Sequence, residues 1–133
     1  MPGTNLTRDE ATTRAGLIAV DSYAVDLDLT TSNTTFPTTS VIRFSCTEPG
    51  ADTFVDFVGE SVQKVTLNGT VIETAYADGR VSIPGLAADN ELVIAATGRY
   101  TNTGEGLHRF VDPVDDEVYL YSQFEVPDSR RMY

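Results

Sequence analysis

The chain is poor in the residues that most often carry out chemistry, with one cysteine, Cys46, one histidine, His108, and no tryptophan. A single cysteine excludes an intrachain disulfide, so nothing indicates an oxidising compartment. Cys46 falls in a predicted strand, where a buried, unreactive thiol is a better interpretation than a nucleophile. A zinc site with three protein ligands would need carboxylates at spacings that no known zinc motif supports. The sequence therefore predicts neither a metal site nor a catalytic residue in this chain.

Positively charged residues are also scarce: the chain has 9 basic and 20 acidic residues, which gives a net charge of −11. Nucleic acids and anionic membranes bind cationic surfaces, so both are excluded as partners. The start of the chain lacks a signal-peptide pattern, and no segment approaches the roughly 20 apolar residues of a membrane span. We therefore expect a cytoplasmic protein. The acidic charge is best explained as solvated surface, although it would also attract a cationic group such as a peptide amino terminus.

Most of the sequence alternates between apolar and polar residues. A chain of 133 residues with 41% apolar residues is expected to form one domain with a core of its own. Thr7 and Glu10 have the spacing of a capping box, which predicts a short helix within residues 4–19. From Val20 onward the period is two, and Tyr23 and Val25 would lie on the core side of a half-buried strand. The expected strands are 20–29, 40–46, 53–58, 62–67, 70–72, 80–83, 92–100 and 118–124.

Turn signals separate these strands at short intervals. Asn68-Gly69 is the strongest short hairpin signal, because both central residues of its turn need positive φ, and Asp78-Gly79 repeats it. About eight strands without helices between them indicate an antiparallel arrangement. The predicted fold class is therefore all-β, an antiparallel β-sandwich with a short N-terminal helix.

The last third of the chain, residues 100–133, differs from this scaffold. We expect a loop that leads into the strand 118–124. Gly104 and Gly106 allow a sharp turn, but they lack the third glycine and the following helix of a phosphate-binding loop. His108 has no serine or cysteine partner in a recognisable arrangement, so a structural role is favoured. The acidic turn at residues 112–117 lacks the spacing of a calcium loop and is interpreted as solvated.

In the strand that follows, Tyr119 and Tyr121 share a face with Gln123 and Glu125. The opposite face is mainly apolar. Two phenols, an amide and a carboxylate in a row are expected to form a recognition surface.

Several segments match a known family: residues 103–110 (TGEGLHRF), residues 119–125 (YLYSQFE), Arg130-Arg131 and the opening residues 1–8. On these motifs the chain resembles the N-terminal domain of bacterial members of the aminopeptidase N family of zinc metallopeptidases. The resemblance implies a saddle-like β-sandwich that packs on a separate catalytic domain of the same polypeptide. It also implies that Gln123 and Glu125 bind the free N-terminus of a peptide substrate.

The chain departs from the family because it lacks both the His-Glu-x-x-His helix and the Gly-x-Met-Glu-Asn-type loop. The resemblance thus implies an excised domain, 1–133, with a helical extension (1–19), a sandwich (20–125) and the start of a linker (126–133). Zinc and catalysis would belong to the parent enzyme, a metallo-aminopeptidase that removes N-terminal amino acids from peptides. The chain alone would hold no cofactor and have no activity.

A second interpretation is a free-standing acidic β-sandwich module that recognises a protein or carbohydrate ligand. The alternating tyrosines and the acidic loops would suit this role, whereas the lack of a secretion signal weighs against adhesion. An autonomous hydrolase is the least favoured, because no coherent nucleophile or metal set is present.

Overall fold

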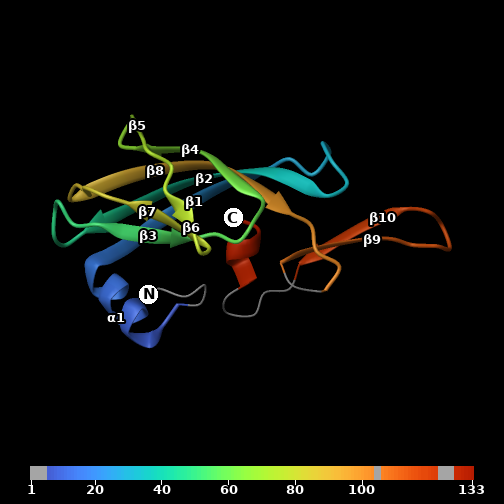
Figure 1. Cartoon of the computed structure of the whole chain (residues 1–133), viewed down its shortest axis with the longest axis horizontal. Helices are drawn as coiled ribbons and strands as arrows, with labels where there is room; N and C mark the ends of the chain where they lie inside the picture. Colours follow the sequence, from blue (N-terminus) through green and yellow to red (C-terminus); the bar gives the residue numbers. More distant parts are fainter. Residues whose placement is uncertain (1–5, 104–105, 123–127) are drawn as a thin grey trace.

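The computed structural model describes residues 6–103, 106–122 and 128–133, which form two packed sheets, a separate hairpin and two short helices (Figure 1). The elements in chain order are α1 (Arg8–Leu17), β1 (Ile18–Leu27), β2 (Thr35–Cys46), β3 (Thr53–Asp56), β4 (Ser61–Leu67), β5 (Thr70–Ile72), β6 (Tyr76–Ala77), β7 (Arg80–Ile83), β8 (Asp89–Arg99), β9 (Leu107–Val111), β10 (Val118–Ser122) and the 3₁₀ helix η1 (Asp128–Arg131). Neither helix of this described part has the length and apolar character needed to cross a membrane.

The strands pair in an antiparallel manner throughout the three sheets. The largest sheet has the order β1-β2-β8-β4-β5, and a three-stranded sheet has the order β3-β7-β6. The hydrophobic core lies between them, since its members come from β2, β4, β7 and β8. The predicted antiparallel β-sandwich with one short N-terminal helix is confirmed.

The central strands β2 and β8 show why the sequence alternates. In β2 every second residue from Phe36 to Cys46 is buried, while the residues between them are less covered. In β8 the same holds from Asn90 to Gly98. Phe36 packs directly on Gly98, where a side chain would overlap the ring. A strand covered on one side only produces this period of two.

The edge strand β1 is less buried than its pattern predicts. Its register places Tyr23 opposite Ile42 and Val25 opposite Ser40, so both side chains point to the core side as expected. However, both remain exposed, as does Val20. A register shift between Val20 and Ser22 interrupts the pairing. These three side chains are exposed because β1 is the outermost strand of the large sheet, so a neighbouring strand covers it on one edge only.

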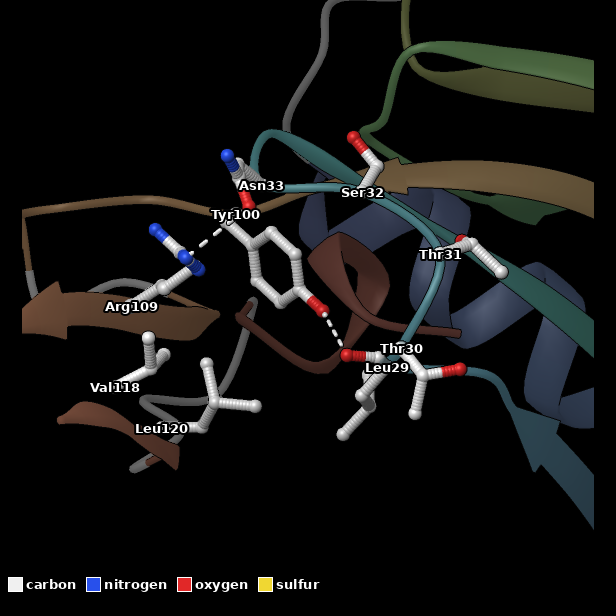
Figure 2. A pocket seen from close by; sticks show the side chains of 9 residues that line it. All are labelled: Leu29, Thr30, Thr31, Ser32, Asn33, Tyr100, Arg109, Val118 and Leu120. Atoms are coloured by element: carbon white, nitrogen blue, oxygen red, sulfur yellow. Dashed lines mark hydrogen bonds between the residues drawn. The ribbon is translucent and has the colours of Figure 1, made fainter.

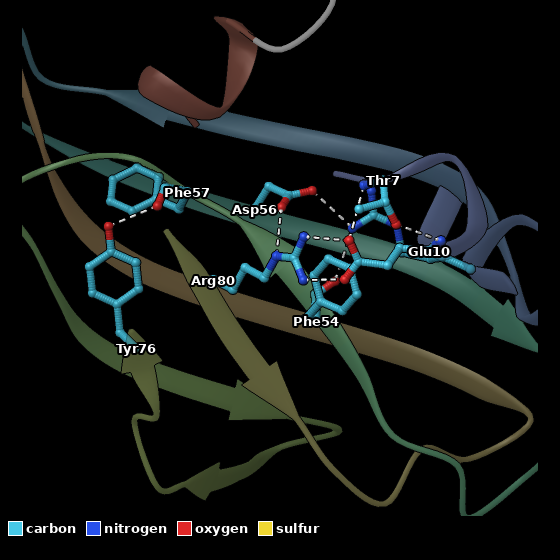
Figure 3. Close-up of polar contacts among 8 residues, drawn as sticks. Thr7, Glu10, Phe54, Asp56, Phe57, Tyr76 and Arg80 are labelled. Carbon is cyan, nitrogen blue, oxygen red and sulfur yellow. Dashed lines mark hydrogen bonds and ion pairs between the residues drawn. The ribbon is translucent and has the colours of Figure 1, made fainter. Parts of the chain in front are cut away.

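The helix α1 begins with the predicted capping box, in which the Thr7 side chain accepts from Glu10 N and Glu10 accepts from Thr7 N. No residue of α1 is buried. Leu17 at the end of α1 packs partly buried against the core, and polar contacts attach the helix to the three-stranded sheet, where Arg80 donates to the Glu10 carboxylate (Figure 3). Arg14 of the helix also pairs with Asp56. The Arg80 hydrogen bond is the main reason why the pKa of Glu10 falls to about 2.

The largest differences from the sequence-based expectations concern three elements. The strand β2 begins at Thr35 and includes Pro37, although we expected a strand from residue 40. Two strands, β6 and β9, were not predicted. Both are short, with 2 and 5 residues, and short segments carry little periodic signal. The turns Asn68-Gly69 and Asp78-Gly79 do have the expected positive φ angles.

Candidate functional site

The strands β9 and β10 form a two-stranded hairpin that extends to one side of the sandwich (Figure 1). Residues 107–111 are therefore a strand, and the prediction of a loop there is wrong. The turn is held by Asp112 N donating to Glu117 O at 2.9 Å and Val114 N donating to Asp112 Oδ1 at 2.8 Å. Asp116 adopts φ 58° in this turn, a conformation that aspartate tolerates better than most residues. The acidic residues thus build the turn.

Four rings occupy one face of this hairpin, which we call the ring face: His108, Phe110, Tyr119 and Tyr121. His108 stacks on Tyr121 with ring centroids 4.7 Å apart, and Phe110 stacks on Tyr119 at 5.5 Å. His108 also meets Phe110 edge to face at 5.8 Å. The strand register explains the stacking, because it sets Tyr121 opposite His108 and Tyr119 opposite Phe110.

The ring face is open to solvent. Phe110 and Tyr119 are each 42% exposed, and Tyr121 is 47% exposed. Each ring can bury a large apolar area when a partner covers it. An aromatic surface of this kind on a projecting hairpin is typical of an interaction site.

The ring of His108 contacts both Phe110 and Tyr121, and its structural role stays a prediction. The tyrosine hydroxyl of Tyr119 donates to Asp115 Oδ2. This bond lowers the pKa of Asp115 and raises the pKa of Tyr119. At neutral pH the carboxylate and the neutral phenol are therefore stabilised together.

Two carboxylates of the acidic turn accept hydrogen bonds within the turn itself. Asp112 Oδ1 accepts from Val114 N, and Asp115 accepts from Glu117 N and from Tyr119. Across residues 6–103, 106–122 and 128–133, no group of three or more His, Cys, Asp or Glu side chains could hold a metal ion. The described part of this chain thus does not fit the zinc ion that the family resemblance implies for the parent enzyme.

The predicted substrate-binding residues Gln123 and Glu125 lie outside the described residues. β10 is described up to Ser122, and its alternation agrees with the sequence pattern through that point. That Gln123 and Glu125 continue the ring face stays a prediction. Gly104 also lies outside the described residues, while Gly106 adopts the positive φ of 69° expected of a turn glycine.

Sequence reasoning assigned no role to Arg109 or Phe110. Arg109 lies opposite Leu120 on the hairpin face turned away from the rings, where the side chains line a pocket (Figure 2). The five residues of β9 alternate only weakly between apolar and polar side chains, so the sequence carries little signal for this strand or for its two faces.

Three comparisons with known proteins bear on the family of this chain. No family model matches the chain. The chain is 54% identical over 138 aligned residues to aminopeptidase N of Streptomyces lividans, an alignment that covers 100% of this chain and 16% of that protein.

Solved structures show the same fold. Two structures of a mutant M1 zinc metallopeptidase from Deinococcus radiodurans, the second with a bound Tyr-Ser-Ala substrate, match with TM-scores of 0.58 and 0.57. Their identities to this chain are 16% and 15%, and each match covers 69% of this chain and 24% of theirs. Over its whole length, the chain is therefore a relative of part of aminopeptidase N, as its motifs indicated, with a fold that M1 zinc metallopeptidases share.

Proposed function

We propose that this chain is the non-catalytic N-terminal domain of a zinc-dependent aminopeptidase N. In this proposal it packs on the catalytic domain of the same polypeptide and supplies residues that bind the free N-terminus of peptide substrates. The observation that carries the proposal is the identity of 54% over the whole chain to a protein of which it spans only 16%.

The ring face supports the docking part of this proposal. An isolated two-stranded hairpin is at best marginally stable in water, and three or more strands or a packing partner normally stabilise it. β9 and β10 form such a two-stranded sheet, and large aromatic side chains remain exposed on it. Contact with another part of a longer polypeptide would bury these rings and stabilise the hairpin.

The substrate-binding part rests on Gln123 and Glu125. A peptide α-ammonium group has three N–H donors, and an ionised Glu125 would accept a charge-assisted hydrogen bond from it. Gln123 would orient the first residue, because its amide can both donate and accept. Contacts of this kind position a substrate from its free amino end. Bond cleavage would be carried out by residues that this chain does not contain.

Mutation of Glu125 in the full-length enzyme tests this assignment. We expect Glu125→Ala to lower kcat/KM for an unblocked aminoacyl substrate by roughly 10- to 100-fold, the effect of losing a charge-assisted bond. The matched control is Glu73→Ala, which removes an exposed carboxylate between β5 and β6. If kcat/KM is the same for Glu125→Ala and Glu73→Ala, the substrate-binding assignment is wrong.

The reading frame of the natural gene beyond Tyr133 tests the parent enzyme directly. We expect it to encode a Gly-x-Met-Glu-Asn-type loop and a His-Glu-x-x-His helix. If the gene encodes neither the loop nor the helix, the proposal of a parent aminopeptidase is wrong, and the free-standing binding module is favoured. The cytoplasmic location stays a prediction, which cell fractionation would check.

A further inference from the structure

The turn between β4 and β5 carries an Asn-Gly pair, Asn68 and Gly69, which occurs once in the sequence (Figure 1). Asparagine is among the thermolabile residues of proteins. The amide carbon of its side chain can be attacked by the backbone nitrogen of the next residue, and a following glycine hinders this attack least because it has no side chain. Both residues are exposed, so water reaches the turn. The pair is therefore a candidate site of chemical modification.

The backbone of the folded turn opposes this attack. Asn68 has φ 52° and Gly69 has φ 83°, the two positive values of a type I′ turn. The first central residue of such a turn also has a positive ψ, because the turn is the mirror image of type I. Attack by Gly69 N on Asn68 Cγ closes a five-membered ring, which needs a negative ψ at the asparagine. The turn must therefore open before the reaction can occur.

Hydrogen bonds also hold the Asn68 side chain against the start of β8. Its Oδ1 accepts from Glu91 N at 2.8 Å, and its Nδ2 donates to Asn90 Oδ1 at 3.1 Å. The backbone N–H of Asn68 donates to Glu91 O at 2.8 Å. Both atoms of the side-chain amide are therefore engaged with β8. The amide carbon between them cannot turn toward Gly69 N until these bonds break.

Asn90 is the fixed partner in this arrangement. It is buried, and its own amide is held at both ends by Ala87. Its Oδ1 accepts from Ala87 N at 2.9 Å, and its Nδ2 donates to Ala87 O at 2.7 Å. The Oδ1 atom that receives the Asn68 amide is thus kept in one position. Loss of this acceptor would leave Asn68 held at its side chain by the Glu91 N–H.

We propose that Asn68 is the site of a spontaneous deamidation and that Asn90 controls its rate. Gly69 N forms a bond to Asn68 Cγ, the Cγ–Nδ2 bond breaks, and ammonia leaves with the proton of the Gly69 N–H. Water then opens the succinimide ring at one of its two carbonyl carbons, which leaves aspartate or isoaspartate at position 68. The net reaction consumes one water and releases one ammonia.

Either product weakens this corner of the large sheet. A carboxylate at position 68 has no N–H to donate, so it would face Asn90 Oδ1 with a second acceptor. Isoaspartate adds a methylene to the backbone of a two-residue turn that pairs Leu67 with Thr70. Modified chains are therefore less stable than native chains. The proposal does not depend on the function of a longer polypeptide.

The test incubates the intact chain at mildly alkaline pH and measures conversion at position 68 by peptide mapping with mass spectrometry, with isoaspartate resolved by chromatography. A synthetic peptide of residues 64–73 gives the rate without the fold. We expect the native chain to react at least roughly 10-fold more slowly than the peptide, because the turn must open first. Asn90→Ala should react roughly 10-fold faster than the native chain, since the Asn68 amide loses its buried partner.

Two control variants separate the turn from general loss of stability. Asn90→Asp loses the bond to Ala87 O, as Asn90→Ala does, but keeps an oxygen acceptor for Asn68 Nδ2. Gly98→Ala disturbs the core under Phe36 without touching the turn. Both should react at close to the native rate.

Equal rates in the native chain and Asn90→Ala would overturn the control by Asn90, as would reaction of Gly98→Ala as fast as that of Asn90→Ala. If neither the native chain nor Asn90→Ala is modified at position 68 after the peptide has reacted completely, Asn68 is not a modification site.

Discussion

Arg80 and Glu10 lie 70 residues apart in the chain and form a two-pronged ion pair, with Arg80 Nη2 donating to Glu10 Oε1 at 3.0 Å and Nη1 donating to Oε2 (Figure 3). The Arg80 residue is only 7% exposed. Its guanidinium lies over the Phe54 ring at 4.3 Å, and its Nε is 3.7 Å from Asp56 Oδ1. Because α1 buries none of its own residues, this pair is a principal attachment of the helix to the sandwich.

The first prediction concerns the pH dependence of this attachment. The Arg80 hydrogen bond lowers the pKa of Glu10 from 4.5 to about 2 in the folded chain. A lowered carboxylate pKa stabilises the fold fully above 4.5, and the contribution is lost as the pH falls toward 2. We expect the free energy of unfolding of the native chain to decrease over this window by more than that of Glu10→Gln.

Urea unfolding at a series of pH values checks this prediction. Asp9→Asn is the control, since Asp9 lies beside Glu10 in the first turn of α1. The difference in unfolding free energy between Asp9→Asn and the native chain should change less between pH 4.5 and 2 than the difference between Glu10→Gln and the native chain. If the free energies of unfolding of the native chain and of Glu10→Gln fall by the same amount between pH 4.5 and 2, the ion pair does not hold the helix.

The sequence predicted one half of this arrangement. The spacing of Thr7 and Glu10 identified the start of α1, because a capping box is local in the chain. The partner Arg80 could not be predicted, since its contact with Glu10 depends on how the three-stranded sheet folds back on the helix. The exposure of Tyr23 and Val25 was missed for the same reason, because the alternation gives the face of a strand but not its place in the sheet.

The second prediction concerns Gly98, which lies under the ring of Phe36. A Cβ at this position would overlap several atoms of the ring, and Phe36 is fully buried, so the ring has no room to move. We expect Gly98→Ala to lower the free energy of unfolding by about 1–3 kcal/mol, the usual cost of overpacking a core.

Gly16→Ala is the matched control for this change. A Cβ at Gly16 would meet nothing within 4 Å, and Gly16 lies in α1. Alanine has the higher helix propensity, so stability should rise by up to about 1 kcal/mol. Denaturant unfolding of both variants measures the contrast, and a Gly98→Ala variant as stable as the native chain would contradict the packing.

The third prediction concerns Asn90, a buried amide at the start of β8. Its Oδ1 accepts from Ala87 N at 2.9 Å and from Asn68 Nδ2 at 3.1 Å, and its Nδ2 donates to Ala87 O at 2.7 Å. Asn90→Ala leaves these groups without partners, so we expect a loss of about 2–3 kcal/mol in unfolding free energy. Asn102→Ala, at an exposed position, should change stability by less than about 0.5 kcal/mol. Similar values for the two variants would show that Asn90 makes no net contribution.

The candidate site was predicted in part. Strand β10 and the common face of Tyr119 and Tyr121 followed from alternation over residues 118–122. The partner strand β9 was missed, because a five-residue segment that contains both His108 and Arg109 has little hydrophobic signal. The pocket at Arg109 could not be predicted either, since it joins residues 29–33 to a hairpin about 80 positions later in the chain.

The last prediction concerns amide exchange in the hairpin. Among the residues that the structure describes, β9 and β10 pair with each other and have one further bridge, between Thr101 and His108. Their amides should therefore exchange through local opening, faster than the amides of β2 and β8 in the centre of the large sheet.

In the longer polypeptide, the docked ring face would have to separate from its partner before the hairpin could open. Docking would therefore raise the free energy of local opening. We expect the exchange of β9 and β10 amides to slow by at least 10-fold there, as measured by hydrogen–deuterium exchange with mass spectrometry. The β4–β5 hairpin is the internal control, because its Val71 side chain is also exposed and no docking is proposed there. Protected β2 and β8 amides show that the shorter chain is folded. If β9 and β10 exchange equally fast in both proteins while β2 and β8 stay protected, the ring face is not the docking surface.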